Sequence, residues 1–459
     1  MNNYLFNFDS KSKKIILVDE DENLITEKEM VKKINMISKY IIDHSVIVLI
    51  ADNCFEFIAG YVASLNNKKT ISIILDKSFS KTYMEKIIRK FKPNYIYSPK
   101  TIFFDNLRFK EINEFKKFKI LKLNFNHERK INNKNFILLS TSGTTESPKF
   151  VRLSKKNIED NTSKIINYLK IKKTHRTITT MPAGYSYGLS ILNSHLKSGA
   201  KIILNNNSVI EKIFWNKINK FKVSSFGGVP ELYEFLKRID FKKYVSKNLK
   251  YLSQAGGKMD ERTLRYFGNI CKINKIKFYV MYGQTEASPR ISYLEWKYFF
   301  SKINSIGKPL KGYKLKIIKK NKEIKKPNIT GEIVLYGDSV CLGYAKNLND
   351  LKKGDVNKKV LYTGDLGFRD KEGFIYLSGR SKKIVKIFGK RYDLLEIENY
   401  LKKSNIKAKC RLEDKKISID VIDLSIKEKI IDIIFNKFQL NKNFISVNLK
   451  KSKNFKEYY

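Results

Sequence analysis

Residues 140–154 read STSGTTESPKFVRLS and combine residue types that can bind phosphate. An apolar run at 136–139 precedes them and predicts a buried strand. A strand that feeds a loop of small hydroxyl residues, one glycine and a Pro-Lys pair leaves many backbone N–H groups free to face an oligophosphate. The spacing is not that of a Walker A loop, because Pro148 stands at the fifth place after Gly143 and Lys149 follows that proline. The alternative is an ordinary polar turn between two strands.

Four more loops follow predicted strands further along the chain. Their sequences are MPAGYSYGLS at 181–190, GGVP at 227–230, QAGG at 254–257 and YGQTE at 282–286. In open α/β sheets, ligands bind beyond the carboxyl ends of the strands. We therefore expect these loops to lie around one site.

The elements that must position these loops alternate between strand and helix. Strands are predicted at 14–19, 46–50, 70–75 and 94–97, and helices at 26–42, 55–65, 80–91 and 156–169. Thr26 and Glu29 have the spacing of a capping box at the start of the first helix. The alternation predicts an α/β fold with a mostly parallel sheet covered by helices on both faces.

Three stretches depart from this pattern. Residues 100–130 are polar and predict an irregular connector with a short strand at 120–123. From about residue 305, short β-type runs separated by glycines predict a twisted antiparallel or barrel-like subdomain. Past residue 379 the pattern predicts a small α+β unit with helices at 394–403 and 426–438. We therefore expect a large domain over 1–379 and a small one over 380–459.

The chain is strongly basic. Its 459 residues include 92 Lys and Arg against 45 Asp and Glu, for a formal net charge of +47. Such a charge raises nucleic acid or an anionic membrane as a partner. The excess is mostly Lys spread from end to end with abundant Asn and Ile, a composition typical of AT-rich codons, and no basic block stands apart from the rest of the sequence. We therefore expect solvated basic faces and no dedicated nucleic-acid or membrane partner.

Cysteine spacing and apolar runs indicate the compartment. Cys54, Cys271, Cys341 and Cys410 are far apart without a C-x-x-C pair, which favours core thiols over a zinc site or disulfides. The apolar runs are far shorter than the ~20 residues of a membrane span, and the first residues lack the apolar core of a signal peptide. A cytoplasmic location is expected.

Five motifs occur in a fixed order along the chain. They are STSGTTESPK, YGQTEAS, GEIVLYG, YTGDLGFRDKEGFIYLSGR and KIVKIFGKRYDLLEIEN. In this order they resemble the acyl-adenylate-forming superfamily, which contains acyl-CoA synthetases, peptide-synthetase adenylation domains and luciferase. The resemblance implies a large N-terminal domain of stacked, mostly parallel α/β subdomains with a β-barrel-like subdomain, and a small mobile α+β C-terminal lid domain.

The resemblance also implies an AMP-forming acid–thiol ligase. In that chemistry a carboxylate attacks the α-phosphorus of ATP, pyrophosphate leaves, and a thiol captures the acyl group. Positioning and charge stabilisation dominate such catalysis. ATP and Mg²⁺ are the implied cofactors, and coenzyme A or the phosphopantetheine of an acyl carrier protein is the implied acceptor.

The resemblance assigns roles to individual residues. Glu286 matches the carboxylate that holds Mg²⁺, and Thr285 matches a contact to the α-phosphate. Tyr282 is similar to the aromatic residue that stacks on adenine, and Asp365 to the acceptor of the ribose hydroxyls. The other implied nucleotide-binding residues are Thr141, Ser142, Gly143, Thr144, Thr145, Lys149, Gly256, Gly257, Gly283 and Arg380.

The implied small-domain residues are lysines. Lys382 falls at the hinge position, and Lys386 matches the lysine presented when the small domain swings to the thiolation arrangement. Lys456 matches the catalytic lysine that bridges the substrate carboxylate and the α-phosphate. Two residues depart from the family pattern: Glu146 stands where a glycine is usual in the phosphate loop, and Phe455 where a glycine usually precedes the catalytic lysine.

A small-molecule carboxylic acid is the expected substrate. The implied acyl pocket comprises Tyr185, Ser186, Gly188, Gly227, Val229 and Gln254. Ser186 stands where amino-acid activators of the family carry an aspartate, so an α-amino acid is disfavoured. The four histidines, His44, His127, His175 and His195, lie in no matched motif and are expected to be structural or at the surface.

Two other functions stay open at this point. A family member whose adenylation is impaired by Glu146 and Phe455 would bind nucleotide without turning it over. A basic protein on the same fold could bind nucleic acid or a membrane instead.

Overall fold

The computed structural model describes residues 5–125, 131–140, 149–380, 384–387, 390–413 and 416–449. The chain divides into two compact units. Unit 1 comprises Met1–Leu139 and Phe150–Gly379, and unit 2 comprises Ser140–Lys149 and Arg380–Tyr459. Thr141 to Thr145, Glu146, Lys382, Phe455 and Lys456 lie outside the described residues, as does His127.

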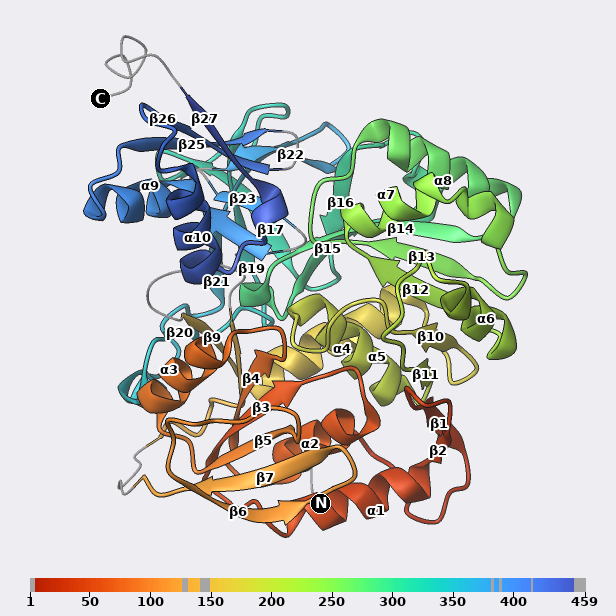
Figure 1. Cartoon of the computed structure of the whole chain (residues 1–459). Helices are drawn as coiled ribbons and strands as arrows, with labels where there is room; N and C mark the ends of the chain where they lie inside the picture. Colours follow the sequence, from red (N-terminus) through yellow and green to blue (C-terminus); the bar gives the residue numbers. More distant parts are fainter. Residues whose placement is uncertain are drawn as a thin grey trace. The chain divides into compact units, whose positions relative to one another are not determined.

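Unit 1 contains an eight-stranded sheet whose centre is parallel (Figure 1). The parallel strands are β3 (Val46–Ala51), β4 (Ile71–Asp76), β5 (Tyr95–Pro99) and β8 (Ile137–Ser140). Antiparallel strands extend it on both sides: β6 (Phe109–Glu114), β7 (Phe118–Leu123), β9 (Phe150–Leu153) and β20 (Gly343–Ala345). Helix α1 (Glu27–Ser38) leads into β3, α2 (Phe55–Asn66) connects β3 to β4, and α3 (Lys81–Phe91) connects β4 to β5.

The irregular connector predicted at 100–130 is wrong for its middle part. That segment contains strand β6, which forms a hairpin with β7. The strand predicted at 120–123 is confirmed as β7, which pairs with β5. Strand β6 is mostly exposed and carries no alternating apolar pattern. Its pairing depends on β7, and local sequence does not reveal such a partner.

A fourteen-stranded sheet forms the rest of unit 1. Its parallel run contains β1 (Ile15–Val18), β10 (Arg176–Ile178), β11 (Lys201–Ile203), β12 (Ser225–Gly228), β13 (Tyr251–Gln254) and β14 (Lys277–Gly283). The antiparallel strands are β2 (Leu24–Thr26), β15 (Arg290–Leu294), β16 (Ser305–Pro309), β17 (Lys314–Lys319), β18 (Lys322–Glu323), β19 (Gly331–Tyr336), β21 (Val360–Arg369) and β22 (Ile375–Arg380). The strands predicted after residue 305 are therefore antiparallel, and among the described residues their sheet stays open, with β18 at its edge.

Two helices lie between the sheets of unit 1 (Figure 1). They are α4 (Lys155–Leu169) and α5 (Ser186–Ser198). Leu189 and Leu192 of α5 pack in one core with Leu49 of β3, while Ile165 of α4 packs in another core with Tyr251 of β13. The opposite face of the larger sheet is covered by α6 (Lys212–Lys220), α7 (Pro230–Arg238) and α8 (Glu261–Ile273). The predicted α/β class, with helices on both faces of a parallel sheet, is confirmed.

Unit 2 is a small α+β unit with its own core. It contains a hairpin of β23 (Ile384–Ile387) and β24 (Lys390–Asp393), and a sheet of β25 (Ala408–Glu413), β26 (Lys416–Val421) and β27 (Ile445–Leu449). Its helices are α9 (Leu394–Lys403) and α10 (Lys427–Phe438). Ile397 of α9, Ile419 of β26 and Ile434 of α10 meet in this core, which explains the apolar spacing that predicted both helices.

Two predictions from local sequence patterns are confirmed by the structure. Thr26 and Glu29 form the expected capping box at the start of α1. All four cysteines are free and buried, as predicted. Among the described residues, none of the helices combines the length and apolar character that crossing a membrane requires.

Arg152 ties β9 to the segments that precede and follow β20. Its side chain is fully buried. Its two terminal nitrogens donate to the carbonyls of Leu342, Lys353 and Gly354, while Nε has no partner. These bonds hold together segments about 200 residues apart in sequence.

Replacing Arg152 with Met should therefore destabilise unit 1, because the three carbonyls would lose their donors. We expect the free energy of unfolding to fall by about 2–4 kcal/mol, measured by urea denaturation. Arg262→Met, at an exposed position of α8, should stay close to wild type. Equal stability of the two variants would contradict this role of Arg152.

Candidate functional site

Three of the predicted site residues lie in unit 1 at or near the end of β14, and two of them are in contact. Tyr282 is near the end of β14 and Asp365 is on β21, and the Tyr282 hydroxyl donates a 2.6 Å hydrogen bond to Asp365 Oδ2. Both side chains are buried. Glu286 follows in the short helix η2 (Thr285–Ala287) and is buried as well. An aromatic ring and two carboxylates thus come from residues about 80 positions apart in sequence.

Thr285 and Ser186 also meet. Their hydroxyl oxygens lie 3.1 Å apart in a buried hydrogen bond, which joins the first turn of α5 to η2. Glu286 accepts a 3.1 Å hydrogen bond from the Tyr344 hydroxyl, and its carbonyl accepts one from the backbone N–H of Cys341. The Glu286 charge is the second cause, after burial, that raises the pKa of the Cys341 thiol to about 12.

Glycines let the neighbouring loops approach one another closely. Gly256 has φ +93°, and a Cβ there would lie 2.8 Å from Val229. A Cβ at Gly227 would collide with the hydroxyls of Tyr187 and Ser253. Gln254 donates a 2.7 Å hydrogen bond to the carbonyl of Gly257. The predicted pocket residues at the ends of β12 and β13 are thus tightly packed.

Several other predicted residues do not test the site. Lys149 is described but belongs to unit 2. The side chains of Arg380 and Lys386 are not among those described. The phosphate-loop residues and Lys456 lie outside the described residues.

A narrow cavity lies beside the predicted acyl pocket. Its volume is about 10 Å³, room for about one water molecule. Besides apolar side chains it is lined by hydroxyl groups, His195, and the buried Arg290 of β15. The lining polar residues are Thr177, Tyr187, Ser190, Ser194, His195, Ser225, Tyr251, Ser253 and Arg290.

Sequence reasoning missed Tyr344 and Arg290. Tyr344 follows the GEIVLYG motif on a strand of the other sheet, so its meeting with Glu286 depends on the tertiary fold. Arg290 had a usable signal: it is the charged residue that follows Ala287-Ser288-Pro289 and opens a predominantly apolar β-type run. A charged side chain in such a run is rarely buried unless it has a partner or a functional role.

A larger hollow of about 700 Å³ lies elsewhere on unit 1. It is bordered by residues that precede β4 and β8, and thus by the amino ends of these strands, with Lys68, Lys134 and Lys156 among its lining residues. None of the predicted site residues lines it. Since ligands in such sheets bind at the carboxyl ends, this hollow is not the predicted site.

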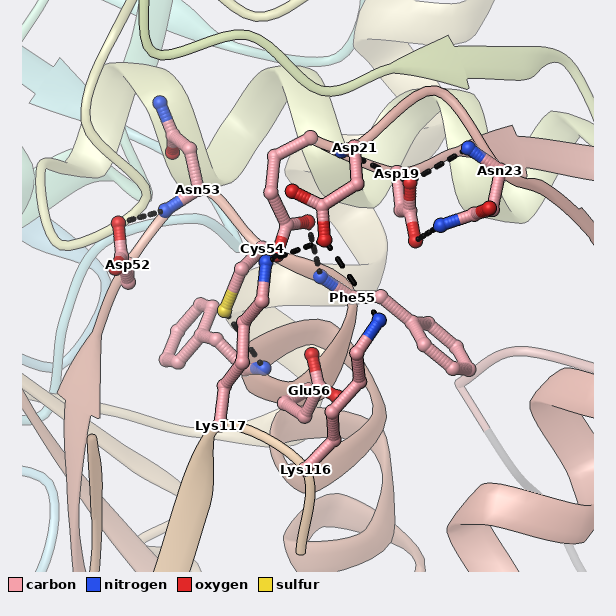
Figure 2. A network of polar contacts seen from close by, with 12 residues as sticks. Asp19, Asp21, Asn23, Asp52, Asn53, Cys54, Phe55, Glu56, Lys116 and Lys117 are labelled. Carbon is pink, nitrogen blue, oxygen red and sulfur yellow. Dashed lines mark hydrogen bonds and ion pairs between the residues drawn. The ribbon is translucent and has the colours of Figure 1, made fainter. Parts of the chain in front are cut away.

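Glu20, Cys54 and Glu56 form a second cluster, whose surroundings Figure 2 shows. Lys117 lies 2.5 Å from a Glu20 oxygen, and Lys33 lies 3.8 Å from Glu56. Cys54 caps α2 by accepting from the N–H of Phe57, and burial raises its pKa. The carboxylates are balanced by lysines and the thiol stays protonated, so the cluster has a structural role.

The larger part of the chain matches one known protein family. Residues 7–345 match the family model described as AMP-binding enzyme. This match confirms the resemblance to AMP-binding, adenylate-forming enzymes that the five motifs predict.

Individual relatives are distant. An oxalate–CoA ligase of Saccharomyces cerevisiae is 26% identical over 58% of this chain and 48% of its own length. A 2-succinylbenzoate–CoA ligase of Bacillus cereus is 30% identical over 58% of this chain and 53% of its own length. The chain thus spans about half the length of the curated relatives it matches. A structure of o-succinylbenzoate CoA synthetase from Bacillus subtilis, bound with its product analogue, has a TM-score of 0.72 and 19% identity, covering 95% of this chain and 92% of that one.

His195 gives a pH-dependent test of the cavity. It is fully buried between Ile191 and Tyr251, and burial lowers its pKa from 6.5 to about 4, while the Ile191 carbonyl opposes the shift. Between pH 6.5 and about pH 4, the His195 side chain is protonated in the unfolded chain but neutral in the folded protein. Stability should therefore fall across this window as pH decreases, by roughly 3 kcal/mol from this group.

His195→Gln should weaken that acid sensitivity in urea denaturation measured from pH 7 to pH 4. His44→Gln, at an exposed position, serves as the matched control and should keep the wild-type slope. If His195→Gln shows the same loss of stability as wild type, His195 is not held neutral.

Proposed function

The chain belongs to the AMP-binding enzyme family, and from this premise we propose that it is an ATP-dependent acid–thiol ligase. The enzyme would activate a carboxylic acid as an acyl-adenylate, release pyrophosphate, and transfer the acyl group to coenzyme A. The hydrogen-bonded cluster at the end of β14 is the observation that carries the proposal.

That cluster supports nucleotide binding by its chemistry. The buried Asp365 has only acceptor oxygens when ionised, which suits a pair of ribose hydroxyls, and its bond to Tyr282 fixes the carboxylate beside an aromatic ring. Gly256, with its positive φ, lets the backbone pass close to the side chains of Val229 and Tyr185. We assign Tyr282, Gly256, Gly257 and Asp365 to the adenosine moiety.

Glu286 and Thr285 would face the phosphates. Glu286 supplies the hard carboxylate oxygen that Mg²⁺ prefers, and Tyr344 orients that carboxylate. Thr285, held by Ser186, would donate to the α-phosphate. Mg²⁺ supplies charge neutralisation for the phosphates when it is bound.

The small domain completes the proposal. We assign 1–379 to the large domain and 380–459 to a lid that turns about Lys382. Lys456 would neutralise charge on the α-phosphate during adenylation, and Lys386 would serve in the thiolation arrangement. Arg380 would contact the ribose, and the phosphate-loop residues with Lys149 would close over the β- and γ-phosphates.

Coenzyme A is the acceptor we propose because both curated relatives are named CoA ligases. Those relatives are named for different acids, so their names do not select a substrate. The phosphopantetheine arm of a carrier protein is the alternative acyl acceptor. Parallel assays with coenzyme A and with a carrier protein separate the two acceptors.

The direct test is acid-dependent exchange of labelled pyrophosphate into ATP by the full chain. A panel of carboxylic acids should contain at least one that supports exchange. An absence of exchange with every acid, in protein that still binds ATP, would contradict ligase activity and favour a nucleotide-binding role.

Lys456→Ala should lower AMP formation by about 100-fold or more while leaving ATP affinity within a few-fold, because the lysine acts on charge that develops during the reaction. Lys453→Ala, in the same segment, is the matched control and should keep wild-type turnover. Unchanged AMP formation in Lys456→Ala would refute the assignment.

Asp365→Asn should weaken AMP binding by about tenfold or more, since a charged acceptor of two hydroxyls is lost. Wild type should prefer AMP over 2′-deoxy-AMP, and the variant should discriminate less between them. Asp105→Asn changes an exposed loop residue and should bind both nucleotides as wild type does. An Asp365 variant with full ribose discrimination would place the ribose elsewhere.

A further inference from the structure

Arg290 is a buried cation whose hydrogen bonding is incomplete. Its side chain is only 2% exposed. The guanidinium lies over the Tyr187 ring, 4.8 Å from the ring centroid, and Nη2 is 3.5 Å from Ser190 Oγ. Its Nε is buried without a hydrogen-bond partner. Within the part of the chain that the structure describes, no carboxylate forms an ion pair with it.

Arg152 is a second buried arginine in the same unit, and its Nε also lacks a hydrogen-bond partner, but its terminal nitrogens are well supplied with acceptors. Three backbone carbonyls surround its terminal nitrogens. The Arg290 guanidinium has two hydroxyl groups, those of Ser190 and Tyr168, and one aromatic face for the same charge, and among the described residues no backbone carbonyl accepts from its terminal nitrogens. An uncompensated buried charge is costly, so a guanidinium in this state is suited to receive an anion.

The surroundings of Arg290 favour an anion as well. The other polar groups that line the cavity are hydroxyls and His195, and the lowered pKa of His195 keeps that ring neutral. Burial raises the pKa of Tyr187 to about 12, so its hydroxyl stays protonated. Among the cavity-lining residues, Arg290 is therefore the charged group, and neutral hydroxyl groups stand beside it.

The position of Arg290 relative to the reaction site limits the size of the ligand. Ser186 contacts Thr285, while Ser190 contacts Arg290, and both serines are on α5. Four residues of helix span roughly 6 Å. A ligand whose reactive carboxylate lies at Ser186 and Thr285 would thus reach Arg290 with a second anionic group about one helical turn away.

We propose that Arg290 binds a second carboxylate of the substrate, so that the enzyme activates short dicarboxylic acids. This inference rests on the proposed ligase function and names its substrate class. Ser190, whose hydroxyl donates to the Tyr187 carbonyl, accepts from Arg290 Nη2 and so positions the guanidinium for that carboxylate.

The test compares acids of matched chain length with and without the second carboxylate. Succinate is paired with butyrate, and glutarate with pentanoate, in acid-dependent pyrophosphate release by the full chain. Wild type should prefer a dicarboxylate over its matched monocarboxylate by about 30-fold or more in kcat/KM. Arg290→Met should lose this preference, largely through KM, and should accept the monocarboxylate at least as well as wild type does.

Two further variants separate specificity from folding. Arg290→Lys keeps the charge and should retain part of the preference, and Ser190→Ala should reduce it without removing it. Arg262→Met, at an exposed arginine, should behave as wild type. Thermal unfolding of each variant establishes that the loss is not a loss of fold.

The outcomes distinguish the two proposals. If wild type releases pyrophosphate with monocarboxylates and Arg290→Met does not change the preference, the role of Arg290 is overturned and the ligase function stands. If no acid supports release, the ligase function fails, and calorimetric titration with succinate and glutarate decides for Arg290. Binding that Arg290→Met abolishes would support the anion site, and its absence in wild type would overturn it.

Discussion

Asn161 of α4 fixes the loop on which the candidate site depends. Its amide nitrogen donates to the carbonyls of Ala287 and Arg290, and its oxygen accepts from the backbone N–H of Arg290. The side chain is fully buried. One amide therefore pins both ends of the segment between η2 and β15 to a helix of the inner layer, and so positions Thr285, Glu286 and Arg290 at once.

This constraint explains how two different chemistries share one short segment. On one side of it, Thr285 and Glu286 meet Ser186 and Tyr344. On the other side, the Arg290 guanidinium enters the cavity beside α5. The first set suits phosphate and Mg²⁺, and the second suits an anionic end of a small acid. Because the segment is held rigidly, the separation between the two is part of the proposed specificity.

Much of the fold was predictable because its signals are local. Thr26 and Glu29 cap α1 as their spacing indicates, and the apolar spacing of 394–403 gives α9 with the predicted bounds. The strand predicted at 120–123 is present as β7, but its hairpin partner β6 was missed, since β6 is mostly exposed and its pairing depends on β7.

The candidate site was predictable from the sequence only in part. Motif order led to Tyr282, Glu286 and Asp365, and the fold brings Tyr282 and Asp365 into contact, although their roles remain predictions. Tyr344 and Arg290 gain their significance only from neighbours more than 50 residues away in sequence, as the Tyr344–Glu286 and Arg290–Ser190 contacts show. Such long-range contacts leave no periodic pattern for the sequence to display.

The most direct measurement follows oxygen from acid to nucleotide. The full chain is incubated with ATP, Mg²⁺, coenzyme A and an acid that supports turnover, with ¹⁸O in its carboxylates, and the products are examined by mass spectrometry. Attack on the α-phosphorus predicts one ¹⁸O atom in AMP and none in pyrophosphate. Label in inorganic phosphate with ADP as the nucleotide product, or AMP without label, would contradict an acyl-adenylate intermediate.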